Sequence, residues 1–330
     1  MATPTISAVA RHAGVSVASV SRVMNGMSAR PKTEKLVKAA IAELGYQPNS
    51  AARALKVRES DQICLSFADL GNPAYVSMTR GVGRVLRDSK YRLLLSSSFS
   101  SVGEIIEQLK SMGRGYADGL IISPIYSDPE ITELIARLKI PVVLIGTAPE
   151  GLKVDNVHID SSVGIKMAVT HLRDRGRKRI GLLNGPLNTN PGYRRSEGFK
   201  RIINSLKLSI DTEQIILAED FSSHGAYKVL AKTTHLREFD ALVCGNDLMA
   251  AGALKFLFEV GISVPDKMAI VGIDNTELGS LIRPTLTSVD LLAEKRGELA
   301  AELLLDRIKN PDFAPRKVLV KPELIVRASS

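Results

Sequence analysis

From residue 62 onward the chain alternates short apolar runs with segments of helical periodicity, and this pattern constrains the fold most. The runs are predicted strands at 63–67, 91–96, 119–123, 142–145, 179–183, 215–218, 241–244 and 268–273. Helices fit between them, for example at 74–88, 104–112, 162–175 and 247–260. Nearly continuous apolar strands that alternate with helices indicate parallel sheets covered on both faces. Eight strands suit two doubly wound lobes better than one, so the predicted class is an α/β core.

The first sixty residues carry a different pattern, that of three short helices. Small and apolar residues recur at helical spacing up to Ala13, and Thr5 can cap this helix. Gly14 permits a sharp turn, Ser16 can cap a second helix over 17–24, and Asn25-Gly26 ends it. A third segment over 31–44 offers an apolar face of Leu36, Val37, Ala40, Ile41 and Leu44. Helix, three-residue turn and helix form a helix-turn-helix, whose second helix can enter the major groove of DNA.

Charge is concentrated in the same segment. Residues 1–60 hold nine Lys and Arg against three Glu, a net of +6 out of +9 for all 330 residues. A basic unit attached to a nearly balanced body fits a module that binds a polyanion. A basic face that only improves solubility is the alternative, and charge alone does not decide between the two.

The second helix carries the residue types that read and hold duplex DNA. Val17 and Ala18 at its start can make apolar contacts, for instance with a thymine methyl group. Arg22, one turn further on, can contact guanine in a bidentate manner. Short polar side chains suit phosphate oxygens. The predicted DNA contacts of the head are Thr5, Ser16, Val17, Ala18, Ser19, Ser21, Arg22 and Asn25. The alternative is a three-helix cap whose serines only cap helices.

Two further features bear on the cellular compartment. The two cysteines, Cys64 and Cys244, are far apart and lie in apolar runs, which favours buried thiols in a reducing compartment. The first residues lack the pattern of a signal peptide, and no apolar run approaches the ~18 residues of a membrane span. We therefore expect a cytoplasmic protein.

Residues 5–25 (TISAVARHAGVSVASVSRVMN) and 42–49 (AELGYQPN) closely resemble the DNA-binding head of the lactose/galactose repressor family (LacI/GalR). The resemblance implies a homodimeric transcriptional regulator, most often a repressor, that binds a palindromic operator. It implies a core resembling periplasmic binding proteins, which binds a small effector between its lobes. The expected organisation is a head at 1–48, a hinge at 49–60 and a core at 61–330. Lobe 1 would comprise about 61–159 and 290–320, and lobe 2 about 160–289 and 321–330.

The hinge contains Asn49, a good helix cap, followed by residues that favour a helix. A helix of about eight residues is marginal alone in water, so we expect it to form only when paired or docked on DNA. The resemblance implies that Leu55 wedges between base pairs in the minor groove, with Arg53 and Lys56 near phosphates. The alternative is a linker with an incidental leucine.

Effector contacts are expected beyond the carboxyl ends of the core strands. Tyr75 can stack on a ring, Ser123 ends a strand, and the resemblance places Arg195, Phe221, Asn246 and Asp274 at ligand-contacting positions. Such planar polar groups with aromatic faces suit a polyol. The alternatives are core packing for Tyr75 and Phe221 and an inter-lobe salt bridge for Arg195 and Asp274. For Asp247 and Asn275 we favour helix capping.

Two departures from the patterns of known relatives narrow the chemical class of the effector. The fourth strand ends in Ile145-Gly146-Thr147, without the Asp that many sugar-responsive relatives carry. The loop after Gly185-Pro186 lacks the Arg and Thr of the purine-responsive type, so a sugar or a sugar derivative is favoured.

Two other classes of protein are alternatives for this chain. One is a sugar-binding solute receptor, and the other is an enzyme that modifies a small molecule and carries a basic N-terminal module. The chain lacks G-x-S-x-G, Walker A and H-E-x-x-H motifs, and its five histidines show no ligand spacing. We expect no catalysis, no cofactor and no metal.

Overall fold

The computed structural model describes residues 4–24, 26–47, 60–98, 101–209 and 213–330. The chain forms two compact units. Residues 1–60 include the head and the hinge, and residues 61–330 form the core. The hinge residues Asn49, Arg53, Leu55 and Lys56, and Asn25 of the head, lie outside the described residues.

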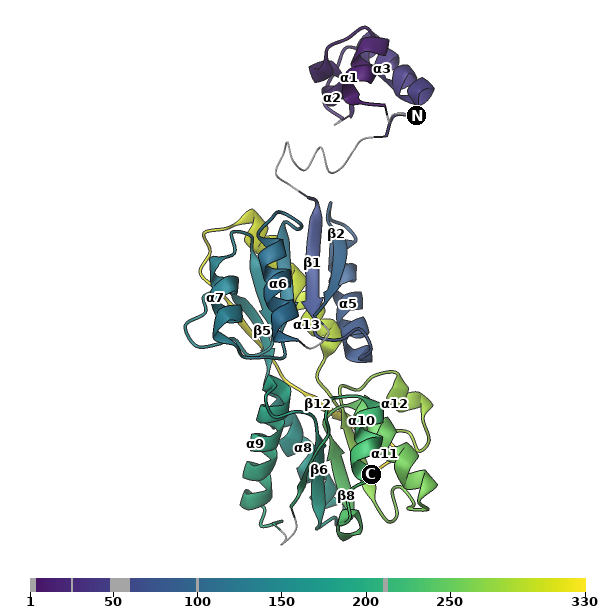
Figure 1. The fold of residues 1–330 in the computed structure, drawn as a ribbon, viewed down its shortest axis with the longest axis vertical. Helices are drawn as coiled ribbons and strands as arrows, with labels where there is room; N and C mark the ends of the chain where they lie inside the picture. Colours follow the sequence, from purple (N-terminus) through teal and green to yellow (C-terminus); the bar gives the residue numbers. More distant parts are fainter. Residues whose placement is uncertain (1–3, 25, 48–59, 99–100, 210–212) are drawn as a thin grey trace. The chain divides into compact units, whose positions relative to one another are not determined.

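The head consists of three helices around a small apolar cluster (Figure 1). They are α1 (Ile6–His12), α2 (Val17–Met24) and α3 (Pro31–Leu44), which confirms the predicted helix-turn-helix. Thr5 Oγ1 accepts a hydrogen bond from Ala8 N, and Ser16 Oγ accepts one from Ser19 N, so both residues cap their helices. The buried cluster comprises Val9, Ala10, Ala13, Val20, Val37 and Ala40.

The prediction that Leu36 belongs to the apolar face of α3 is wrong. Leu36 leaves 43% of its surface exposed, whereas its neighbour Val37 is fully buried. Consecutive helical residues point about 100° apart, and α3 packs only one narrow stripe, through Val37 and Ala40, against α1 and α2. Leu36 falls outside this stripe.

The core contains two six-stranded sheets, each covered by helices on both faces, which confirms the predicted fold class (Figure 1). In lobe 1 the order is β11 (Lys317–Val320), β5 (Asp155–Ile159), β4 (Val142–Ile145), β3 (Gly119–Ser123), β1 (Gln62–Phe67) and β2 (Arg92–Ser97). In lobe 2 it is β12 (Glu323–Ile325), β10 (Thr287–Asp290), β9 (Ala269–Ile273), β8 (Ala241–Cys244), β6 (Ile180–Asn184) and β7 (Ile215–Leu217). All pairs are parallel except β10 with β12.

Alternate residues of each strand point to opposite helical layers. In β1, Ile63, Leu65 and Phe67 join the cluster under α5 (Pro73–Leu86) and α13 (Ala293–Lys309), while Cys64 joins the cluster under α6 (Val102–Met112) and α7 (Pro129–Arg137). Lobe 2 is built in the same way, with α8 (Ser161–Asp174) and α9 (Asn190–Ser205) on one face. Its other face carries α10 (Ser223–Leu230) and α11 (Asp247–Glu259), with the short α12 (Leu278–Leu281) and η1 (Leu236–Glu238) nearby.

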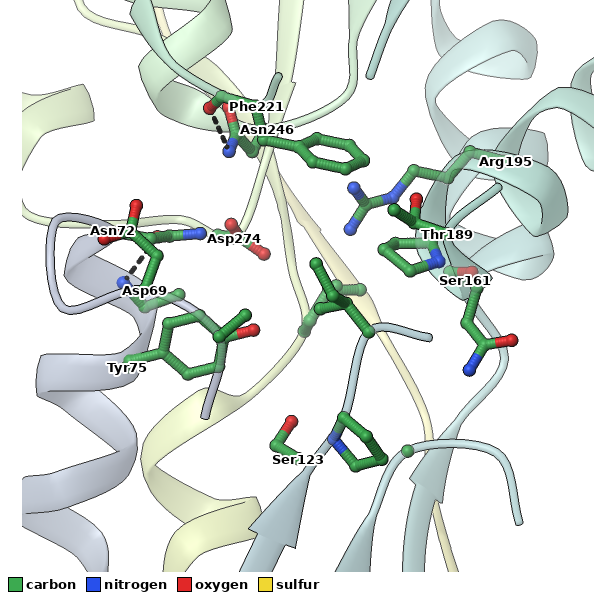
Figure 2. A pocket seen from close by; sticks show the side chains of 18 of the residues that line it. Asp69, Asn72, Tyr75, Ser123, Ser161, Thr189, Arg195, Phe221, Asn246 and Asp274 are labelled. Carbon is green, nitrogen blue, oxygen red and sulfur yellow. Dashed lines mark hydrogen bonds between the residues drawn. The ribbon is translucent and has the colours of Figure 1, made fainter. Parts of the chain in front are cut away.

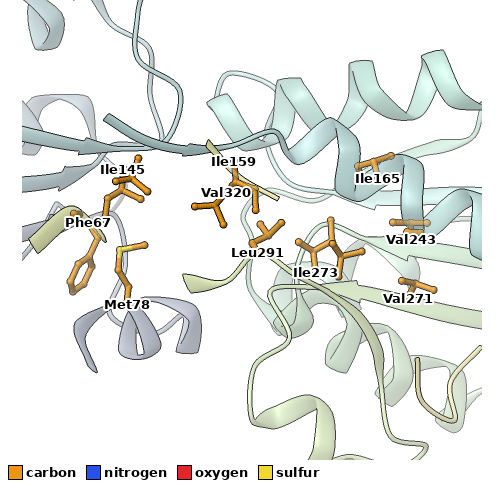
Figure 3. Close-up of a cluster of buried hydrophobic side chains, with 14 of the residues drawn as sticks. Phe67, Met78, Ile145, Ile159, Ile165, Val243, Val271, Ile273, Leu291 and Val320 are labelled. Carbon is orange, nitrogen blue, oxygen red and sulfur yellow. The ribbon is translucent and has the colours of Figure 1, made fainter. Parts of the chain in front are cut away.

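The chain passes between the two sheets three times: from β5 to α8, from β10 to α13, and from β11 to β12. At these passages Ile159, Leu291 and Val320 join one apolar cluster that continues into both lobes (Figure 3). The lobes are therefore linked by a packed junction as well as by the chain, and the open side of that junction is where a ligand could enter.

Both cysteines are free and buried, as their apolar surroundings predict. Burial raises the pKa of Cys64 to about 12, so this thiol remains protonated and unreactive at neutral pH. None of the described helices is long and apolar enough to cross a membrane.

Candidate functional site

A cavity of about 440 Å³ lies between the two lobes, at the carboxyl ends of their strands. Its size falls within the usual range for small-molecule sites. The structure brings together in its wall all six residues that the sequence singles out there: Tyr75, Ser123, Arg195, Phe221, Asn246 and Asp274 (Figure 2). Lobe 1 contributes the first two, and lobe 2 contributes the other four.

Tyr75 projects from the first turn of α5, which Pro73 opens and Asn72 caps. Its ring stacks on Phe67 with centroids 4.9 Å apart, so it also belongs to the packing of lobe 1. Burial, with the nearby charge of Asp274, raises the pKa of Tyr75 to about 12. The phenol therefore keeps its proton and can donate a hydrogen bond to a ligand.

Arg195 lies on α9 with only 7% of its surface exposed. Its guanidinium carbon stands 5.7 Å from the centre of the Phe221 ring, a cation–π distance. The Nε atom is buried and has no hydrogen-bond partner. Burial lowers the pKa of Arg195, while Asp274 acts in the opposite direction. A planar cation is thus held in place by an aromatic face, with its donors left for a ligand.

Asp274 follows β9 with a φ of 106°, a conformation that non-glycine residues rarely adopt. Its backbone N–H donates to Val289 O at 2.8 Å, and the side chain of Asn72, from lobe 1, points toward its carboxylate (Figure 2) and acts to lower its pKa. Burial raises the pKa of Asp274, and Arg195 and Arg296 oppose that shift. Neither Arg195 nor Asp274 forms an ion pair within 4 Å with another described residue, so the alternative of an inter-lobe salt bridge for these two residues is wrong for this conformation.

Asn246, not Asp247, caps α11. Its Oδ1 accepts from Met249 N at 2.8 Å, and its Nδ2 donates to Phe221 O at 2.9 Å, so it also fixes the loop that carries Phe221. The capping interpretation of Asp247 is wrong because that residue already has helical backbone. Its buried carboxylate instead accepts from Thr276 N, Thr276 Oγ1 and Ser288 Oγ.

Burial raises the pKa of Asp247 to about 7, and the nearby Asp274 contributes in the same direction. The capping interpretation of Asn275 is also wrong. Its Nδ2 donates to Asp290 at 2.9 Å, and its Oδ1 accepts from Arg327 at 2.7 Å. Both side chains tie the ends of lobe 2 strands to one another and do not start a helix.

Among the wall residues that sequence reasoning missed, two face the predicted ones most directly in charge and hydrogen bonding. Asn72 caps α5 and reaches Asp274 across the cavity, and Arg296 of α13 is buried with its Nε unpartnered. A signal for Arg296 exists in the sequence. It stands at helical spacing from Ala293 and Ala300, both of which are buried, so it falls on the covered face of an amphipathic helix.

In the head, most of the described residues predicted to contact DNA lie on α2 or just before it. Val17 exposes 40% of its surface and Ala18 and Arg22 are exposed too, whereas Val20 is fully buried. Ser16 Oγ and Ser19 Oγ lie 2.9 Å apart and bond each other. Two exposed residues stand at helix starts: Thr5 precedes α1 and Ser16 precedes α2. Ser19 and Ser21 are part-exposed along α2. The helix therefore presents apolar, hydroxyl and guanidinium groups outward, the set that reads a major groove.

Comparisons with known proteins agree with this geometry. Residues 5–49 match the model of bacterial regulatory proteins of the lacI family, and residues 169–330 match a periplasmic binding protein-like domain. The ribose operon repressor of Escherichia coli (strain K12) is 30% identical over 330 residues, which is 99% of both chains.

Two solved structures are similar over most of the chain. A lac repressor dimer bound to operator and the anti-inducer ONPF matches with a TM-score of 0.85 and 25% identity over 99% of each chain. A LacI family transcriptional regulator from Enterococcus faecium with bound ribose matches with a TM-score of 0.70 and 26% identity, over 82% of this chain and 98% of that one.

A helix-turn-helix head joined to a two-lobed core with a ligand-sized cavity defines a DNA-binding transcriptional regulator. Within that class, the chain belongs to the LacI family of bacterial regulatory proteins.

Proposed function

We propose that this regulator is a homodimeric repressor that binds a palindromic operator in the cytoplasm and responds to a sugar or a sugar derivative. The observation that carries the proposal is the presence in one chain of the exposed, Arg22-bearing face of α2 and the polar cavity of the core. Its relatives include a ribose operon repressor and a regulator with bound ribose. We propose the predicted divisions at 1–48, 49–60 and 61–330 as its working parts.

In the head, Val17, Ala18 and Arg22 would contact base edges, and Thr5 with the serines of α2 would contact phosphates. Two heads, one from each protomer, would occupy the two half-sites of the operator. For the hinge we keep the prediction that Asn49 opens a helix, that Leu55 enters the minor groove, and that Arg53 and Lys56 lie near phosphates.

In the core, the effector would occupy the cavity between the lobes. One hydrogen bond already spans it, since Asn190 N donates to Ile125 O at 2.6 Å, and Asn72 of lobe 1 acts on the pKa of Asp274. A ligand that adds contacts to both walls favours the closed arrangement of the lobes, and closure would change the spacing of the hinges. Moving a regulator from nearly all bound to nearly all released requires about 5.5 kcal/mol of difference in effector affinity.

We propose that the same wall binds the sugar without converting it and that the sugar is released unchanged. Tyr75 and the cavity cations are hydrogen-bond donors, and the described wall holds neither a histidine nor a cysteine. Chromatography of a sugar that the protein binds, before and after prolonged incubation, should show no product. Conversion of the sugar would favour the enzyme alternative.

The test of the proposed function is a DNA-affinity measurement on the full chain. Genomic fragments are selected with the protein, and the affinity for the best fragment is measured by fluorescence anisotropy with and without sugars. Asp274→Ala should keep the DNA affinity and lose the response to the sugar, because it removes the carboxylate that faces both lobes. A response that survives Asp274→Ala would show that the effector binds elsewhere.

A further inference from the structure

Two buried guanidinium groups face the cavity without an ion-pair or hydrogen-bond partner among the described residues. Arg195 and Arg296 expose 7% and 9% of their surfaces, and the Nε atom of each is buried without a hydrogen bond. Neither side chain forms an ion pair within 4 Å with any residue of the described parts of the core. A buried charge is costly unless it is paired and hydrogen-bonded, so these donors are available to a ligand.

The two cations come from opposite walls. Arg195 is carried by α9 of lobe 2, whereas Arg296 is carried by α13, which packs on α5 and on β3, β4 and β5 of lobe 1. Burial lowers the pKa of Arg296, and the positive charge of Arg195 adds to that effect. The two groups thus lie within electrostatic range and repel each other across the cavity.

The carboxylates of the region do not cancel this charge. Asp274 is the half-buried carboxylate of the wall, and it acts on both guanidinium groups without forming an ion pair within 4 Å, so one negative charge faces two positive charges. Asp290 also acts on Arg296, but its two oxygens accept hydrogen bonds from Asn275 Nδ2 and Leu292 N. Asp247 is enclosed by its own three donors. The remaining acidic residues of the wall, Asp69, Glu219 and Asp220, are exposed to solvent.

We propose that the effector is an acidic sugar derivative, with a carboxylate or phosphate group held between Arg195 and Arg296. This assignment rests on the proposed function and specifies the class of its ligand. Guanidinium groups bind carboxylate and phosphate oxygens through paired, charge-assisted hydrogen bonds. The sugar hydroxyls would then face Asp274 and the phenol of Tyr75, which are the neutral or anionic groups of the same wall.

The position of the two cations also links the ligand to lobe closure. An anion between them replaces repulsion across the cavity by attraction to both walls, so the acidic group itself draws the lobes together. A neutral sugar would accept hydrogen bonds from the guanidinium groups through its hydroxyl oxygens but would leave their charges uncompensated in a closed, desolvated cavity. The acidic group therefore acts as the regulatory element, and the hydroxyl pattern selects among acids.

The experiment uses the full chain and four variants: wild type is compared with Arg296→Met, Arg296→Lys, Arg195→Met and Lys295→Met. Lys295 precedes Arg296 on α13 but is exposed and outside the cavity wall, so its variant removes the same charge as a matched control. The probes are inorganic phosphate, ribose with ribose 5-phosphate, and glucose with glucuronate, gluconate and glucose 6-phosphate. The readouts are the thermal midpoint and the affinity for the selected DNA fragment.

We expect phosphate to raise the midpoint of wild type and Lys295→Met in a saturable manner, and to raise that of Arg296→Met and Arg195→Met much less. Among the sugars, an acidic member should stabilise wild type, and Arg296→Met should weaken its binding about tenfold or more. Arg296→Lys, which keeps the charge but loses the planar fork, should lie between. Carboxylate and phosphate probes distinguish the two sources of the acidic group.

Two results would overturn the inference: an equal response of wild type and Arg296→Met to phosphate and to every acid, or stabilisation by neutral ribose or glucose that both proteins share. If a neutral sugar alters DNA affinity, the proposed function holds while the acidic class fails. If the anion response depends on Arg296 but no probe alters DNA affinity, the site stands and the regulatory role fails. Circular dichroism of each variant confirms that the comparison is made on folded protein.

Discussion

In the head, the described side chains predicted to contact the macromolecule are at least partly exposed around a cluster of six buried residues, whereas in the core the six predicted cavity residues are buried or half-buried. Val17 and Arg22 need little from the fold except the direction of α2. Arg195 and Asp274 depend on burial, on strand ends and on an aromatic neighbour for their chemistry. Surface residues of the head should therefore change recognition without changing stability, whereas residues of the cavity wall should couple the two.

The largest effect is expected where two core helices touch. At Gly81 of α5, an added Cβ would lie 2.0 Å from the backbone oxygen of Glu294 on α13. We expect Gly81→Ala to cost on the order of 4 kcal/mol, because two backbones must separate. It should also weaken ligand binding, since α5 carries Tyr75. Urea unfolding followed by circular dichroism measures the cost.

Gly83, on the same helix, is the matched control. A Cβ there meets nothing within 4 Å, so Gly83→Ala should stabilise the helix by about 1 kcal/mol. Equal effects of the two substitutions would show that α5 and α13 are not in close contact.

The next effect separates packing from recognition within α2. Val20→Ala removes two fully buried methyl groups from the small cluster of the head and should destabilise it by about 2 kcal/mol. Val17→Ala, three residues earlier and exposed, should leave stability unchanged and alter the preference for a base. Hydrogen exchange of the head amides in the full chain measures the stability of both variants. If Val17→Ala destabilises the head as much as Val20→Ala, the outward direction of Val17 is refuted.

Arg22→Ala should weaken operator binding by about 1–3 kcal/mol and relax the preference at one base position of each half-site. The guanidinium is exposed on α2, so the fold should not change. Anisotropy titrations against a set of single-base operator variants measure this. A uniform loss of affinity across all sequences would identify Arg22 as a phosphate contact.

The smallest effect is a pH dependence that belongs to the core alone. Because burial raises the pKa of Asp247 to about 7, the folded protein holds a proton there that the unfolded chain has released. Stability should therefore fall as the pH rises from about 5 to 7, and then level off. Burial lowers the pKa of His171, which gives the opposite slope over part of that range.

The difference between wild type and Asp247→Asn isolates the contribution of Asp247. The asparagine can still accept from Thr276 and can donate to Ser288 Oγ, so the cluster should remain packed. We expect the variant to lack the falling component between pH 5 and 7 in its unfolding free energy. Identical curves for the two proteins would mean that Asp247 remains ionised throughout.

The sequence predicts the central strands of both sheets because their apolar runs are buried on both faces. Four strands escaped prediction. β5 carries a buried Asp155 that accepts from Arg307 and Arg316. In the polar β10, Ser288 Oγ donates to Asp247 and Thr287 Oγ1 accepts from Arg327 N. The edge strands β11 and β12 alternate only weakly. Long-range partners satisfy these polar residues, and a local pattern cannot reveal such partners.

The site is predicted in part for a similar reason. Residues that follow apolar strands or match a family position, such as Arg195, Phe221 and Asp274, are found from order along the chain. Arg296 comes from a helix that returns to lobe 1 after the chain has completed most of lobe 2, so its arrival at the cavity depends on topology. The exchange of roles between Asn246 and Asp247 depends on which residue keeps extended backbone, a difference of one position.

The most direct test of the account is one titration on the full chain. The affinity for the selected operator fragment is measured in the absence and in the presence of a saturating compound whose binding to the protein has been established by thermal shift. The account predicts a change of at least about tenfold in DNA affinity, which corresponds to 1.4 kcal/mol of coupling between cavity and head. An unchanged affinity with the cavity filled would contradict it.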